Sequence, residues 1–137
     1  MKWKKYKYTA QLGPGGSVTY RPLLSVRIAT ETYPPGRDVL AIIDSGTDST
    51  VFNADIARAL GVDPRDCRKI RMGGIGVVDG FLCDVKIVIP DFDLSMNVSV
   101  AFLENPPFDA LLGQRDFFER FKVLFEKDQQ QFKLALV

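Results

Sequence analysis

The sequence contains no histidine and only two cysteines, and each shortage excludes a class of active site. Without histidine, neither a Ser-His-Asp triad nor a Cys-His pair can form, and the commonest zinc ligand is missing. Cys67 and Cys83 lie sixteen positions apart and form no CxxC pair, so we expect no metal site. A disulfide between them could form but is not required, and reduced thiols in a cytoplasm are the default expectation.

Long apolar runs and a net charge are also lacking. No stretch approaches the roughly 18 apolar residues that a membrane helix needs, and the start lacks the apolar core of a signal peptide. The 18 basic residues nearly balance the 17 acidic ones, so no overall field favours nucleic acid or an anionic membrane. The lysine-rich residues 1–9 could touch phosphates, but such a segment is more often an edge strand protected from aggregation. We therefore expect a cytoplasmic protein with no nucleic-acid or membrane partner.

What the sequence does contain is a period of two. Its 137 residues, 46% of them hydrophobic, are enough for one domain with a real core, and we expect residues 1–137 to form a single domain. Apolar and polar residues alternate along three segments and thereby predict half-buried strands, whereas two segments that are apolar on both faces predict central strands. The alternating segments are 18–28, 81–89 and 94–102, and the central ones are 39–43 and 109–112.

Helical signals are few. A short helix is expected at residues 54–61, with Asn53 as its N-cap and Gly61 as its stop, and another at residues 115–121. Residues 121–136 are typical of two strands around a polar turn. The prediction is a mostly β protein with two short helices.

The chemistry must then come from carboxylates, hydroxyls, lysines or a thiol, and Asp44 is the best-placed candidate. It directly follows the apolar run 41–43, and an ionised carboxylate is costly to bury without partners. Gly46 lets the backbone turn and approach a substrate, and the hydroxyls of Ser45 and Thr47 can orient the acid. Taken alone, this segment is more simply explained as an Asx turn.

Two glycine-containing segments favour a functional interpretation of Asp44. Residues 71–81, RMGGIGVVDGF, suit the tip of a mobile hairpin. They do not fit the dinucleotide fingerprint, because Asp79 stands where a glycine is needed and a strand pattern follows, so no cofactor is expected. Residues 109–118, DALLGQRDFF, place an apolar pair and a glycine directly before a short helix.

These three motifs, in this order, resemble the retropepsin-type aspartic proteases, the family of the retroviral proteases. DSGTDSTV is similar to the family's Asp-Thr/Ser-Gly-Ala/Thr signature, GGIG is similar to the tip of its flap, and the similarity runs in order over residues 22–125. The resemblance implies a closed β-barrel-like acid protease fold and the hydrolysis of peptide or protein substrates. Because each subunit of that family contributes one aspartate, and the chain holds one such motif, it also implies a homodimer.

The resemblance also implies roles for individual residues. Asp44 of the two chains would share a proton and activate one water, Ser45 would bond across the dimer, and Thr47 would place a hydroxyl near the carboxylate. Gly46 and Asp48 would contact the substrate backbone, and the segment from Gly73 to Gly76 would close over it. The implied site consists of Asp44 for catalysis, Ser45, Gly46 and Thr47 for support, and Asp48, Gly73, Gly74, Ile75 and Gly76 for substrate binding.

Two alternatives remain. A retropepsin-like domain can serve as a non-catalytic dimerisation or peptide-binding module. A glycosidase using Asp44 and Asp48 is also conceivable, but it leaves the glycine-rich segment and the LLG segment unexplained. The intact motif together with the glycine-rich segment favours an aspartic endopeptidase, because a binding module has no need of a paired carboxylate.

Overall fold

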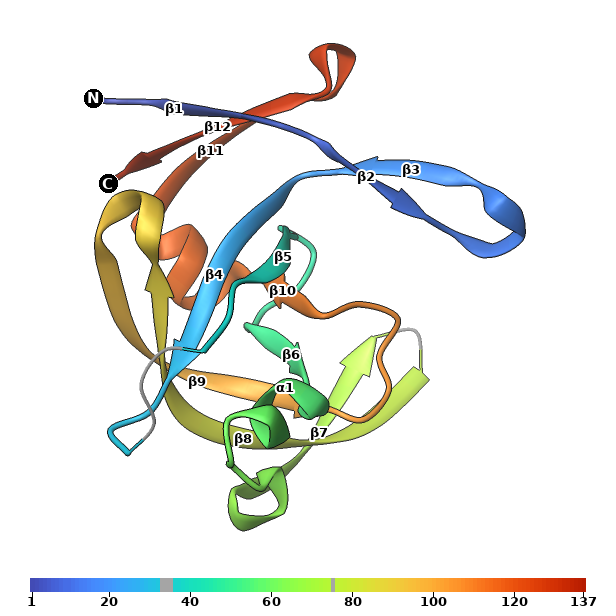
Figure 1. Cartoon of the computed structure of the whole chain (residues 1–137), viewed down its shortest axis with the longest axis vertical. Helices are drawn as coiled ribbons and strands as arrows, with labels where there is room; N and C mark the ends of the chain where they lie inside the picture. The colour runs from blue at the N-terminus through green and yellow to red at the C-terminus, as the bar shows by residue number, and fades with distance from the viewer. Residues whose placement is uncertain (33–35, 75) are drawn as a thin grey trace.

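The structure is a computed structural model that describes residues 1–32, 36–74 and 76–137 (Figure 1). In these ranges the chain forms twelve strands, one α-helix and several shorter helical turns. The strands are β1 (Lys4–Lys7), β2 (Thr9–Leu12), β3 (Val18–Arg21), β4 (Leu23–Ala29), β5 (Val39–Ile43), β6 (Val51–Asn53), β7 (Arg68–Gly74), β8 (Gly76–Ile89), β9 (Leu94–Leu103), β10 (Ala110–Leu112), β11 (Phe121–Glu126) and β12 (Gln131–Leu136). The helix is α1 (Ala54–Ala59), and the helical turns are η1 (Pro14–Gly16), η2 (Pro64–Asp66), η3 (Pro90–Phe92), η4 (Gln114–Phe118) and η5 (Lys127–Gln129).

The main sheet has seven strands in the order β4-β5-β10-β6-β9-β8-β7. Strand β4 also pairs with β8, so the sheet closes into a ring and β7 is left outside it as an edge strand. Most neighbours are antiparallel, but β5 pairs with β10 and β6 with β9 in parallel. The two central strands expected at residues 39–43 and 109–112 are β5 and β10, and they lie side by side.

The predicted alternation of buried and exposed residues is confirmed along β8 and β9. The apolar residues of these strands that face the core are Cys83, Val85, Ile87, Ile89, Met96, Val98, Val100 and Phe102, all buried. The segment 18–28 is different, because Pro22 divides it into β3 and β4. Proline has no N–H to donate to a strand ladder, so the chain changes sheet there. Only the β4 half is buried, whereas Val18 and Tyr20 of β3 are exposed.

Helix α1 confirms the first helical prediction. The Asn53 side chain accepts a hydrogen bond from the N–H of Asp55 (2.9 Å), and Gly61 follows the helix with a φ of +82°. The second predicted helix is reduced to the irregular turn η4, which continues to residue 120. Arg115 is extended there and Asp116 has a φ of +68°, so the first turn is drawn out of helical geometry.

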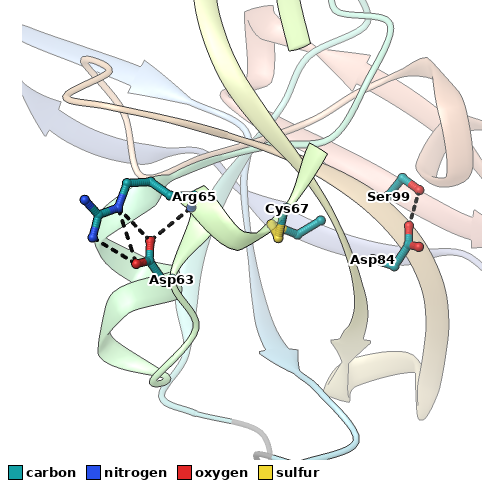
Figure 2. Close-up of a disulfide and its surroundings, with 6 residues drawn as sticks. Asp63, Arg65, Cys67, Asp84 and Ser99 are labelled. Carbon is teal, nitrogen blue, oxygen red and sulfur yellow. Dashed lines mark hydrogen bonds and ion pairs between the residues drawn. A yellow bond between two sulfur atoms is a disulfide. The ribbon is translucent and has the colours of Figure 1, made fainter. Parts of the chain in front are cut away.

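Cys67 and Cys83 form a disulfide, so the expectation of reduced thiols was wrong (Figure 2). The reason is strand register. Arg68 pairs with Leu82 across β7 and β8, and the next residue pair outward is Cys67 and Cys83, whose Cα atoms are 5.3 Å apart. A sequence separation of sixteen residues does not reveal this pairing. The turn η2 directly precedes Cys67. It begins after Asp63, whose side chain accepts a hydrogen bond from the N–H of Arg65 (3.0 Å).

The two ends of the chain form a sheet of their own, in the order β1-β12-β11 (Figure 1). The lysine-rich start is indeed an edge strand, β1, and residues 121–136 are the expected pair of strands around a turn. Strands β2 and β3 form a separate hairpin that extends away from the rest of the chain in Figure 1. Within the described ranges, none of the helices has the length and apolar character needed to cross a membrane.

Candidate active site

Asp44 stands at the carboxyl end of β5, where three elements meet. Its N–H donates to the carbonyl of Leu112 (2.9 Å) on β10, and the N–H of the preceding Ile43 donates to the carbonyl of Pro22 (3.0 Å). The central strands therefore fix the backbone of Asp44 from both sides. Its side chain is half-buried at this edge of the sheet.

The two oxygens of the Asp44 carboxylate are not equivalent. The N–H of Gly46 donates to Oδ1 (2.9 Å), which closes the Asx turn expected for the isolated motif. None of the described residues donates to Oδ2. The turn and a chemical role are thus compatible, because the turn uses one oxygen and leaves the other available.

The loop after Asp44 is held by the segment that follows β10. The side chain of Gln114 donates to the carbonyl of Ser45 (2.7 Å), and its backbone N–H donates to the carbonyl of Thr47 (2.9 Å). The N–H of Arg115 donates to the carbonyl of Asp48 (2.9 Å). These bonds hold the Asp44 loop against the start of η4.

Gly113 makes this close approach possible. A Cβ atom at this position would lie 2.5 Å from the carbonyl oxygen of Ser49 and 2.6 Å from that of Thr47. Real Cβ atoms do not approach backbone oxygens so closely, so only glycine fits. The sequence motif pointed to Gly113, but the clamping role of Gln114 had no recognisable signal in the sequence.

The other predicted support residues lie in the same loop. Ser45 and Gly46 are exposed, whereas Thr47 is half-buried. The Thr47 hydroxyl donates to the carbonyl of Ser49 (3.4 Å) and not to Asp44. Asp48 is exposed. The pKa of Asp116, which follows Arg115, is raised above its usual value. Burial is the main cause and the carboxylate of Glu119 adds to it, while Arg120 and Arg115 partly offset the increase.

A groove of about 650 Å³ opens beside Asp44. Its walls are the end of β5, the hairpin of β2 and β3, and the segment before β10. The lining residues are Gln11, Leu12, Gly13, Pro14, Thr19, Arg21, Pro22, Ile42, Ile43, Asp44, Pro107, Phe108 and Leu111. Most are apolar, while Arg21 and Asp44 bring one charge of each sign. Such a groove suits a peptide with apolar side chains.

The glycine-rich segment is the tip of the hairpin formed by β7 and β8, as expected. Gly74 is opposite Gly76, and Gly76 has a φ of +93°, a conformation that favours glycine. Ile75 lies outside the described residues. In the single chain, neither Gly73, Gly74 nor Gly76 lines the groove beside Asp44. Sequence reasoning placed these glycines at the site, and the fold of one chain does not bring them into the Asp44 groove.

The peptide hydrolysis that the sequence resemblance implies would need more than one Asp44. A single carboxylate can take a proton from water, but it cannot at the same time donate one to a carbonyl group. Within the described ranges, no group of three or more histidine, cysteine, aspartate or glutamate side chains could hold a metal ion.

No protein-family model and no curated protein matches this sequence, whereas solved structures do. The retropepsin-like aspartic protease from Rickettsia conorii is 16% identical with a TM-score of 0.63, covering 97% of this chain and 91% of that one. The EIAV protease in complex with the inhibitor HBY-793 is 20% identical with a TM-score of 0.52, covering 72% and 86%. The retroviral protease-like domain of Ddi1 from Leishmania major is 14% identical with a TM-score of 0.52, covering 84% and 94%. The chain therefore has the retropepsin fold.

Proposed function

We propose that this protein is an aspartic endopeptidase that acts as a homodimer. The observation that carries the proposal is the Asp44 carboxylate, which is fixed at the end of a central strand with Oδ2 unbonded beside an apolar groove. The retropepsin fold supports this proposal, because the solved structures that share it include a retropepsin-like aspartic protease.

The proposed mechanism needs Asp44 from two copies of the chain. Two carboxylates held about 3 Å apart cannot both ionise readily, so one stays protonated. The protonated acid donates to the carbonyl oxygen of the substrate, and the ionised one takes a proton from a water that attacks the carbonyl carbon. The acid that gained the proton from water then donates it to the leaving nitrogen as the peptide bond breaks. The other carboxylate takes a proton back from a hydroxyl of the tetrahedral diol as the new carboxyl group forms, so both acids return to their starting states.

The surroundings of Asp44 would prepare this step. The Gly46 N–H holds Oδ1, so the carboxylate keeps one orientation and Oδ2 is directed to the water. The bonds from Gln114 keep the loop rigid, which lowers the reorganisation needed in the transition state. The apolar groove would take side chains next to the scissile bond, Asp48 would bind the peptide main chain, and the β7–β8 hairpin would close over it and exclude water.

A second candidate is a non-catalytic dimerisation or peptide-binding module. The bond from the Gly46 N–H to Oδ1 favours it, because this bond is all that a purely structural turn requires. In that case Asp44 would stabilise the loop and take no part in a reaction.

The variant Asp44→Asn separates the two candidates. The amide keeps the shape and the acceptor oxygen for Gly46 and removes repulsion between paired charges, so the dimer should be at least as stable as the wild type. Cleavage of a denatured protein at mildly acidic pH should vanish, because both general bases are lost. Binding of a statine-type peptide inhibitor should weaken but persist.

A matched control is Asp128→Asn, which removes an exposed carboxylate in the turn between β11 and β12, away from the groove. It should leave cleavage unchanged. A purified Asp44→Asn dimer that still cleaves peptides at near the wild-type rate would refute the catalytic role and leave the binding module.

A further inference from the structure

The hairpin of β2 and β3, residues 9–21, has one polar and one apolar face; it is called the arm below. In its register Ala10 is opposite Tyr20 and Leu12 is opposite Val18, while Thr9 and Gln11 are opposite Arg21 and Thr19. Directly opposed residues share a face, and successive residues alternate between faces. Ala10, Leu12, Val18 and Tyr20 therefore share one face, and Thr9, Gln11, Thr19 and Arg21 share the other.

The polar face already has a place in the molecule, whereas of the apolar face only Leu12 also lines the groove. Gln11, Thr19 and Arg21 line the groove beside Asp44, and the bend that begins at Leu12 forms its rim. On the apolar face, the exposed fractions are 84% for Leu12, 52% for Val18 and 46% for Tyr20. An apolar patch rimmed by polar residues on a folded chain indicates an interaction surface.

The arm also lacks strand neighbours. Within the described part of the chain, β2 and β3 pair with each other and with no other strand. A two-stranded hairpin alone is marginally stable in water. Figure 1 shows the arm reaching beyond the start of β4 with the body of the chain on one side only. Packing against a second surface would therefore stabilise it.

The root of the arm lies directly at the candidate active site. Pro22, the residue after β3, accepts the hydrogen bond from the N–H of Ile43, next to Asp44. If two copies bring their Asp44 carboxylates to about 3 Å, both arm roots lie at the contact between the copies. By two-fold symmetry, any contact that one arm makes with the other copy is made by both arms in the same way.

We propose that the arm is a dimerisation arm, whose apolar face at Leu12, Val18 and Tyr20 packs against a second copy of this chain while its polar face borders the groove. The proposal rests on the proposed function only in that the Asp44 pair determines where the second copy lies. It assigns a specific stretch of sequence to the dimer interface.

The test is the dimer dissociation constant, measured by sedimentation at a series of concentrations. The triple variant Leu12→Ser, Val18→Ser, Tyr20→Ser should raise this constant at least about tenfold, because each apolar side chain loses its burial against the second copy. The matched control is Gln11→Ala with Thr19→Ala on the polar face of the same arm. It should leave the constant within about twofold of the wild type.

A second measurement uses the wild type alone, in case the triple variant folds poorly. Hydrogen exchange at residues 10–20 should be slower in the dimer than in the diluted monomer.

An unchanged dissociation constant in the folded variant would overturn the proposal. If KM changed while the dissociation constant did not, the arm would be a wall of the substrate groove and not part of the dimer interface. A wild type that stays monomeric, or equal exchange in both states, would also overturn it. A dimer that depends on the arm but cleaves no peptide would refute the proposed function and leave the arm intact.

Discussion

At the scale of single residues, Gly113 is the position where the smallest change should do the most damage. Its Cβ would fall 2.5 Å from the carbonyl oxygen of Ser49, and neither backbone segment can retreat without breaking the Asp44 loop. We expect Gly113→Ala to lower the free energy of unfolding by about 1–3 kcal/mol, as for other overpacked sites, and to reduce cleavage strongly. Denaturant unfolding and a peptide assay measure the two effects.

The matched control for this prediction is Gly73→Ala in β7. A Cβ there meets no atom within 4 Å, so the free energy of unfolding should stay within about 0.5 kcal/mol of the wild type. If Gly113→Ala were as stable and as active as the wild type, the loop would be able to shift, and the rigidity assigned to it would be wrong.

At the scale of elements, the disulfide ties down the hairpin that carries the glycine-rich tip. Strand β7 is at the edge of the main sheet and pairs only with β8 among the described strands. Cys67–Cys83 lies at the base of that hairpin, where it joins β7 to β8 covalently (Figure 2). The base of the hairpin is therefore held in register.

Replacing both cysteines by serine should lower the free energy of unfolding by about 3 kcal/mol, the value typical of a closed loop of this length. Urea unfolding measures the loss, and hydrogen exchange should place the loosening in residues 68–82. Wild-type protein unfolded in excess dithiol should behave like the variant. Equal unfolding of the wild type with and without dithiol would show that the cysteines are not joined in solution.

The boundary between β3 and β4 makes the arm a hairpin separate from the main sheet. The alternation of apolar residues runs without a break from Val18 to Ile28, so it predicts one strand with one buried face. Pro22 interrupts the ladder, and the two halves enter different sheets. The same alternation therefore faces the core in β4 and solvent in β3.

At the scale of the whole molecule, activity should depend on protein concentration. In the proposed mechanism the site is made by Asp44 from two chains and exists only in the dimer. Specific activity should therefore fall when the protein is diluted below its dissociation constant. Cleavage assays at serial dilutions, paired with sedimentation, measure this. Activity per chain that stays constant down to a demonstrated monomer would contradict the shared site.

Much of the fold could be predicted because it depends on local patterns. Alternation along β8 and β9, the doubly apolar β5 and β10, and the Asn53 cap of α1 are each contained in a few consecutive residues. Asp44 and its loop were predicted for the same reason, since an acid after a buried strand is visible without any partner. The location in a cytoplasm stays a prediction.

The sequence by itself determined the strand-rich class and the position of Asp44 at the end of a buried strand. Only the tertiary structure decided which atoms meet: Gln114 with the Asp44 loop, Cys67 with Cys83, and the polar face of the arm with the groove. The physical reason is the distance between the contacting residues along the sequence. Strand periodicity and helix caps are properties of neighbouring residues. By contrast, Gln114 and Ser45 are 69 positions apart and the two cysteines 16, and such contacts depend on strand register and tertiary packing, which no local pattern reveals.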